Sequence, residues 1–266
     1  MDAKHLGGAV AMLAAALALL LTVAAGAARA QAPAQVQSPA PAQSPTPAQS
    51  PATGAARPAP DRAVSRQEAA TAKRVSEAAA VVTRMESAPR MKQLLQTAKG
   101  IFIIPTYVRA ALGVGATGGA GVLLVKRADG SWSDPAFYNL AGISVGAQAG
   151  AEGGPVALVL NNDVAVNKFM QKTEFSLNAD AGLTIINWAK TVQGTAGEGD
   201  VVVWTGTEGL FGNVAAVGVN GIRYSQGANN AYYHQTVTAQ DVVAGKYNNA
   251  RSEPLKQSLA KAAAKS

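Results

Sequence analysis

The chain has 266 residues, a net charge of +7, no cysteine and two histidines. The lack of cysteine excludes disulfide frameworks, cysteine nucleophiles and a lipidated N-terminal cysteine, and so few histidines argue against zinc sites and histidine-based triads. Residues 61–266 are enough for one domain with a sizeable core, and all fourteen aromatic residues lie between Phe102 and Tyr247.

Residues 1–30 have the pattern of an export signal. A charged start precedes an apolar run over residues 6–25, and Ala28-Arg29-Ala30 supplies the small residues that a signal peptidase needs before Gln31. We therefore expect an exported protein, periplasmic or secreted, peripheral on the envelope membrane at most. The alternative is an uncleaved anchor, because the apolar run approaches the roughly 20 residues that span a bilayer.

Residues 31–60 predict a linker. They hold eight of the thirteen prolines, and a Gln-Ser-Pro unit recurs every six residues from Gln37. Such a composition cannot bury a core and favours an extended spacer of up to ~90 Å at about 3.1 Å per residue.

Residues 61–87 predict a helix, since they are rich in alanine and charge and contain no glycine or proline. Ser65 and Glu68 have the spacing of a capping box. At 100° per residue, one face is basic and the opposite face carries valines. The basic face holds Arg62, Arg66, Lys73 and Arg84, and the apolar face holds Val64, Val75 and Val82. A second short helix should start near Pro89 and end at Gly100.

The positive charge of the domain is concentrated in these two helices. Residues 62–99 hold eight basic and three acidic residues, a net charge of +5, which equals the net charge of residues 61–266. The basic residues are Arg62, Arg66, Lys73, Arg74, Arg84, Arg90, Lys92 and Lys99. An acidic partner is therefore expected to bind here.

Residues 99–150 predict consecutive paired strands, with a turn at Asp129-Gly130. Glycines at alternate positions leave no side chain on one face, so another backbone, a ring or a ligand can approach closely there. These glycines are Gly113, Gly115, Gly119 and Gly121. Trp132 is expected to pack at the end of the hairpin.

The remaining elements continue the pattern of short strands and helices. We expect a buried strand at 155–161, followed by a helix that Asn162 caps. Strands at 175–188 and 201–205 should flank a glycine-rich loop, and glycine-rich strands should follow over 209–224. A short helix capped by Thr238 and a closing helix at 252–264 should complete the domain. The fold class is therefore α+β: a strongly twisted antiparallel sheet or partly closed barrel over residues 101–224, flanked by N- and C-terminal helices.

Motifs for catalysis and nucleotide binding are weak. Residues 113–118 match the dinucleotide fingerprint literally, but the sequence continues as a strand where that motif needs a helix. His234 is interpreted as a surface or edge residue. The carboxylates are expected to serve turns or strand ends; they are Asp129, Asp134, Glu152 and Asp163.

The apolar run over residues 101–125 is long enough to suggest a transmembrane helix. Arg109 within the run, Pro105 and five glycines favour a strand of a soluble sheet instead.

Several motifs together resemble the SYLF domain, a lipid-binding module, over about residues 65–250. They include the run 98–105, the 130–137 segment around Trp132 and the paired tyrosines before Val237. The motif residues are Gly100, Pro105, Gly113, Gly115, Gly119, Gly121, Trp132, Pro135, Gly142, Gly146, Gln148, Gly150, Gly209 and Phe211. The chain departs from the family pattern at 184–188 and at His234.

The resemblance implies phospholipid binding through the N-terminal amphipathic helix and a basic surface, which makes the eight basic residues of 62–99 candidate lipid contacts. Some eukaryotic members also bind actin. The export signal makes intracellular actin and phosphoinositides unsuitable ligands, so the expected partner is an anionic phospholipid or membrane surface of a bacterial-type envelope. No nucleic acid, nucleotide, cofactor or metal is expected, and no enzymatic activity.

Two alternatives stay open. The chain could be a structural envelope protein or surface antigen that binds a protein partner, or a hydrolase with two carboxylates that converge in space.

Overall fold

The structure, a computed structural model, describes residues 60–171, 173–177, 182–192, 199–206 and 221–264. The chain divides into two units, Met1–Gly54 and Ala55–Ser266, and every described residue belongs to the second. The expected export signal, nearly all of the linker, Gly209 and Phe211 lie outside the described residues.

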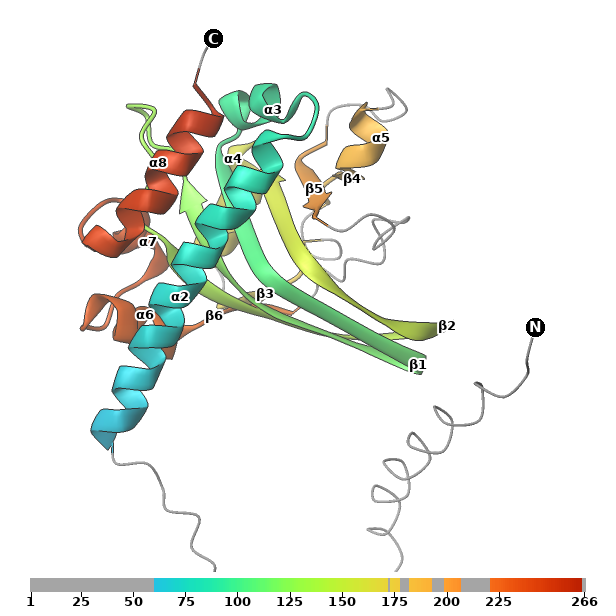
Figure 1. Cartoon of the computed structure of the whole chain (residues 1–266), viewed down its shortest axis with the longest axis horizontal. Coiled ribbons are helices and arrows are strands. Elements are labelled where there is room, and N and C mark those ends of the chain that lie inside the picture. Colours follow the sequence, from blue (N-terminus) through green and yellow to red (C-terminus); the bar gives the residue numbers. More distant parts are fainter. Residues whose placement is uncertain (1–59, 172, 178–181, 193–198, 207–220, 265–266) are drawn as a thin grey trace, which may run out of the picture. The chain divides into compact units, whose positions relative to one another are not determined.

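Helices flank one sheet in the described part of the chain (Figure 1), which confirms the α+β class. The helices are α2 (Pro60–Glu86), α3 (Met91–Thr97), α4 (Asp163–Gln171), α5 (Trp188–Val192), α6 (Gln226–Tyr233), α7 (Ala239–Val243), η2 (Ala250–Ser252) and α8 (Glu253–Ala262). The strands are β1 (Gly100–Val125), β2 (Ala136–Leu160), β3 (Glu174–Phe175), β4 (Ile185–Asn187), β5 (Val201–Thr205) and β6 (Ile222–Tyr224).

The long strands β1 and β2 form an antiparallel hairpin that pairs from Gly100 with Leu160 to Leu123 with Ala136, with register shifts between Ile104 and Tyr107 and between Leu112 and Val114. The expected turn at Asp129-Gly130 is confirmed, because the Gly130 amide donates to the Arg127 carbonyl and Gly130 has φ of +84°. The run over residues 101–125 is therefore a strand, and no helix in the described ranges is long and apolar enough to cross a membrane.

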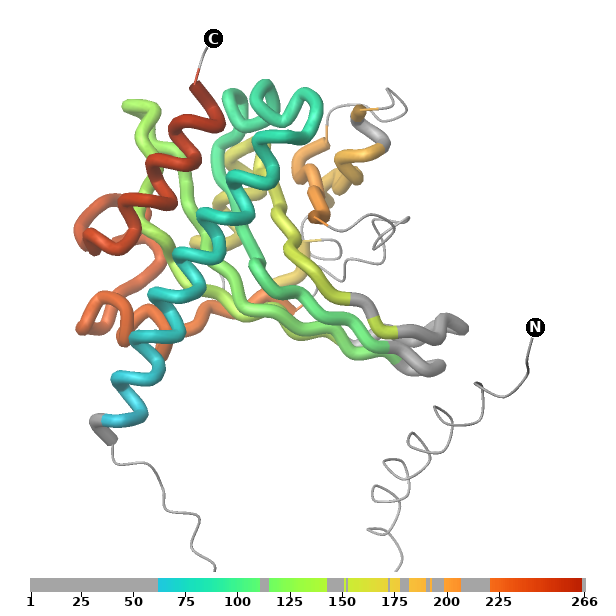
Figure 2. Tube along the Cα trace, in the orientation of Figure 1, coloured from blue at the N-terminus to red at the C-terminus, as the bar shows by residue number. Residues whose placement is uncertain are grey.

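Strand β1 folds back on itself, so that its two ends meet. The amide of Lys126 donates to the carbonyl of Lys99 at 2.8 Å. A Cβ on Gly121 would lie 2.6 Å from the Ile103 carbonyl oxygen and 2.6 Å from the Phe102 ring. The expected close approach at the glycines is confirmed here, and the chain's own backbone and a ring occupy the space. Figure 2 traces the bent hairpin.

Strand β2 is the centre of the sheet, whose order is β3-β6-β2-β5-β4, with β1 paired to β2. Strand β4 runs parallel to β5, which departs from the antiparallel pattern expected from the sequence. A parallel pair needs a crossover, and α5 lies in that connection. The strand expected over residues 175–188 is thus wrong in extent: β3 and β4 are separate and Trp188 starts a helix.

Helix α2 packs against α6, α8 and β1 (Figure 1), which confirms a helix over the expected residues. Val75 and Val82 are buried, whereas Val64 is 56% exposed. Only the middle and C-terminal part of the valine face is therefore docked. The expected helix end at Gly100 is wrong, because α3 ends at Thr97 and Gly100 starts β1.

Candidate functional site

The basic face of α2 is exposed and spread out. Arg62 and Arg84 are 22 positions apart, or about 33 Å along the helix at about 1.5 Å per residue. Lys73 forms an ion pair with Glu77 at 3.5 Å, and the Arg84 guanidinium donates to the Gly206 carbonyl at 2.7 Å. The face is therefore a stripe suited to an extended acidic surface rather than a pocket for one small anion.

Arg74 differs from the other basic residues of α2 because it packs inward. Its guanidinium carbon lies 5.8 Å from the centre of the Phe137 ring, and burial lowers its pKa. Its Nη1 atom is buried without a hydrogen-bond partner among the described residues. Arg74 thus contributes to packing between α2 and β2.

The other three sequence-predicted cations surround α3. Arg90 is the residue before the helix, with φ of +59°, Lys92 lies in its first turn, and Lys99 lies between the helix and β1. All three are exposed. They extend the positive surface from α2 to the start of β1.

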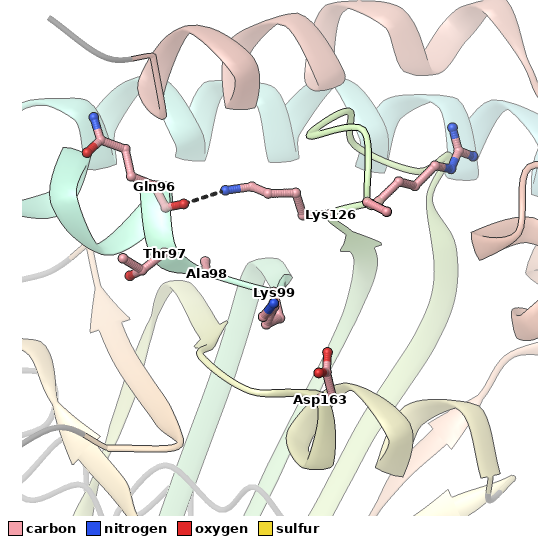
Figure 3. Close-up of a pocket in the computed structure, with 8 residues that line it drawn as sticks. Gln96, Thr97, Ala98, Lys99, Lys126 and Asp163 are labelled. Carbon is pink, nitrogen blue, oxygen red and sulfur yellow. Dashed lines mark hydrogen bonds between the residues drawn. The ribbon is translucent and has the colours of Figure 1, made fainter.

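A cleft of about 320 Å³ lies where α3, both ends of β1 and the start of α4 meet (Figure 3). It is lined by Gln96, Thr97, Ala98, Lys99, Lys126, Arg127, Ala128 and Asp163. Three cations and one carboxylate therefore contribute to its wall.

Lys126 is fixed in this cleft by the end of α3. Its Nζ atom donates to the carbonyls of Leu95 at 2.7 Å and Gln96 at 3.0 Å, and lies 5.0 Å from the Trp132 ring centre. Burial and, to a lesser extent, the charge of Lys99 lower the pKa of Lys126. The expectation that Trp132 is a packing residue is confirmed by its exposure of only 3%.

Sequence reasoning selected Lys99 but missed Lys126 and Arg127. The sequence does show Lys99 immediately before the apolar strand and Lys126 and Arg127 immediately after it. A 26-residue strand normally separates such residues widely, since each residue extends it by about 3.3 Å. Only the bend in β1 brings them together.

Asp134 is the one sequence-selected carboxylate that the structure shows to be buried, and its contacts are structural. It accepts hydrogen bonds from the Ser252 hydroxyl at 2.6 Å and the Asn249 amide at 3.0 Å, and Lys256 Nζ lies at 3.2 Å. This cluster joins the hairpin loop to η2 and α8. It offers no exposed nucleophile.

Two buried tyrosines also have structural roles. Tyr138 and Tyr233 donate to the carbonyls of Phe169 and Pro135, and burial raises the pKa of both hydroxyls. His234 ends α6 at the surface, 3.8 Å from Glu68, as expected. Within the described residues, no group of three acidic or histidine side chains is arranged to hold a metal ion.

The family-motif residues within the described ranges lie at the start of β1 and in the hairpin. Gly100, Pro105, Gly113, Gly115, Gly119 and Gly121 lie in β1, Trp132 and Pro135 in the loop, and Gly142, Gly146, Gln148 and Gly150 in β2. Residues 113–118 lie inside β1 and do not open a helix, as expected from the weak dinucleotide match.

Comparison with known proteins matches residues 141–262 to the Ysc84 family model, described as "Las17-binding protein actin regulator". SH3 domain-containing YSC84-like protein 1 of Homo sapiens is 26% identical over 155 residues, covering 57% of this chain and 45% of that protein. Protein YSC84 of Saccharomyces cerevisiae is 26% identical over 158 residues, covering 58% of this chain and 33% of that protein. LAS seventeen-binding protein 3 of the same yeast is 27% identical over 158 residues, with 58% and 34% covered.

The alignments span less than half the length of these curated relatives. No solved structure gives a significant match. The family model begins in β2, so α2, α3 and β1 lie outside the residues that it matches. The matched segment, residues 141–262, is similar to the Ysc84 family, and this similarity agrees with the SYLF-domain resemblance of the motifs in the β1–β2 hairpin.

Proposed function

We propose that this protein is a non-enzymatic binding protein for anionic phospholipid surfaces in a bacterial-type cell envelope. The observation that supports this most directly is the concentration of positive charge on the exposed side of α2 and around α3. Arg62 and Arg66 are exposed and form no ion pair with any other described residue. Exposed cations without an ion-pair partner are available to a negatively charged surface.

The docked state of α2 limits how such binding can work. Val75 and Val82 are buried against the body of the domain, so the middle and C-terminal part of the apolar face is not available for insertion into lipid. Each basic side chain near an anionic membrane contributes about 1 kcal/mol, so four residues supply at most about 4 kcal/mol, roughly a thousandfold in partitioning. Binding through the stripe should therefore be peripheral, reversible and sensitive to salt.

Cosedimentation of the whole chain with vesicles tests this proposal. Vesicles with and without phosphatidylglycerol are compared at low and high salt, for the wild type and for a variant with Arg62, Arg66, Lys73 and Arg84 all changed to Gln. A matched control changes Lys168, Arg223, Lys246 and Lys261 to Gln, which removes the same charge elsewhere. Binding only to anionic vesicles, lost in the stripe variant and kept in the control, supports the proposal. Equal binding by both variants rejects the stripe as the contact surface.

A protein-binding role is the second candidate, because the description of the matched family refers to Las17 binding and the name of one relative refers to LAS seventeen binding. The match to the family model covers residues 141–262 and none of the basic residues of α2. A partner recognised by that segment should bind equally well to the wild type and the stripe variant. Absence of vesicle binding under all conditions would favour this second role.

A further inference from the structure

We propose that the cleft between α3, β1 and α4 is a binding site for a phosphomonoester group. This inference goes beyond the proposed lipid surface: the cleft shares Lys99 with the positive surface around α3 but uses none of the basic residues of α2. Its cations come from the two ends of β1, which the hydrogen bond between the Lys126 amide and the Lys99 carbonyl holds side by side.

The charges of the cleft are not balanced by its own residues. The side chain of Lys99 is exposed, and its ammonium group has no hydrogen bond or ion pair with another described residue. Neither Lys99 nor Lys126 forms an ion pair with Asp163 within that part of the chain. Figure 3 shows Lys99 between Lys126 and Asp163. Two neighbouring ammonium groups repel each other, and an anion between them removes this repulsion.

Lys126 is suited to a fixed binding role because two of its three N–H groups are already committed to α3 carbonyls. One N–H group remains for a ligand. Lys99, by contrast, is free to move onto the anion. A phosphate oxygen held by both lysines would form charge-assisted hydrogen bonds, which are roughly twice as strong as neutral ones.

The size and lining of the cleft select the ligand class. Its volume corresponds to about ten water molecules at about 30 Å³ each, and most of its lining side chains are polar or charged. A phosphate ester fits this space, whereas an acyl chain would leave the charged groups without partners. The phosphate can belong to a lipid headgroup or to a soluble ester, and both present the same chemistry.

Removing the charge of Asp163 should have the opposite effect on phosphate affinity from removing the charge of Lys99. Its carboxylate lines the cleft and repels a bound dianion, so removing its charge should strengthen binding. Lys99→Gln should weaken phosphate binding about tenfold, and Asp163→Asn should strengthen it about threefold. Both residues are exposed, so neither change should prevent folding.

The experiment measures the affinity of the full-length protein for inorganic phosphate and glycerol 3-phosphate by NMR titration. Lys92→Gln is the matched control, since it removes one charge from an exposed position of α3 that does not line the cleft. Weaker binding in Lys99→Gln, stronger binding in Asp163→Asn and unchanged binding in Lys92→Gln support the site. No binding at millimolar phosphate, or equal binding by Lys99→Gln and wild type, overturns it.

Vesicles separate the two sources of the phosphate. If the headgroup is the ligand, vesicles with phosphatidic acid, a monoester, should bind better than vesicles of equal charge made with phosphatidylglycerol, and glycerol 3-phosphate should compete. If a soluble ester is the ligand, the titration succeeds and the two vesicle types bind alike. Either result supports the cleft, and loss of vesicle binding in the α2 stripe variant tests the lipid surface separately.

Discussion

Asn229 of α6 hydrogen-bonds to both backbone polar groups of Phe137 in β2. Its Oδ1 atom accepts from the Phe137 amide at 3.0 Å, and its Nδ2 atom donates to the Phe137 carbonyl at 2.9 Å. The side chain is fully buried, so it takes the place of a neighbouring strand at this position. One amide side chain thus joins the C-terminal helices to the sheet.

Asn229→Ala should destabilise the domain by about 2 kcal/mol, because it leaves the buried Phe137 amide without a partner and removes one of the two donors to the Phe137 carbonyl, the Ser225 amide being the other. Chemical denaturation of the full-length protein measures this change. Asn230→Ala, on the same helix and partly exposed, should change the free energy of unfolding by less than about 0.5 kcal/mol. Equal effects in the two variants would contradict the role given to Asn229.

Gly121→Ala should be strongly destabilising, by about 3 kcal/mol or more, because its new Cβ would meet the Ile103 carbonyl and the Phe102 ring. Gly118→Ala is the control in the same strand. A Cβ there would lie 3.8 Å from the Leu140 oxygen, an ordinary contact. Thermal melts should separate the two variants clearly, and similar midpoints would show that β1 does not fold back as described.

Trp132→Ala should lower stability by about 3 to 5 kcal/mol, since it empties a buried site and removes the ring beside Lys126. Trp132→Phe should recover part of this loss, because a ring remains for packing and for the Lys126 ammonium group. An unchanged thermal midpoint in Trp132→Ala would reject the packing role.

Glu68 should make stability depend on acid pH. The hydrogen bond from Arg251, at 2.6 Å, holds the pKa of Glu68 below its usual value of 4.5. Because the folded pKa is the lower one, the stabilisation is present above about pH 4.5 and is lost as the pH falls through the folded value. Glu68→Gln should therefore be less stable than wild type at pH 7, and the two urea midpoints should converge as the pH falls below 4.5 and through the lower folded pKa of Glu68. A constant difference across this range would exclude the linkage.

Local elements could be predicted because their signals lie within a few residues of each other. Thr238 accepts a hydrogen bond from the Asp241 amide, and Asn162 accepts one from the Ala165 amide, as their positions before α7 and α4 predict. The hairpin turn at Asp129-Gly130 could be predicted from its two adjacent residues in the same way.

Helix α6 was missed because its own sequence is a poor helix signal. It contains Gly227 and two asparagines, which have low helix propensity. The structure shows what compensates: Asn229 bonds to Phe137, and Tyr232 and Tyr233 are buried. These partners are more than 90 positions away along the chain, so no local pattern reveals them.

The candidate site was predictable in charge but not in geometry. The sequence locates the basic residues on α2 and α3, while the burial of Arg74 depends on a ring from β2. The cleft was beyond sequence reasoning, because Lys99 and Lys126 meet only through the bend of β1.

The contacts of Asp134 also set an order of events during synthesis. Its hydroxyl donor, Ser252, is made 118 residues later, and its ammonium partner, Lys256, 122 residues later. Until both exist, burial of the hairpin loop would place a carboxylate in the interior without its donors, which is strongly unfavourable. A nascent chain can therefore form the β1–β2 hairpin early, but it cannot bury the loop around Asp134 until α8 has been synthesised. A chain that ends before Ser252 should keep this loop exposed.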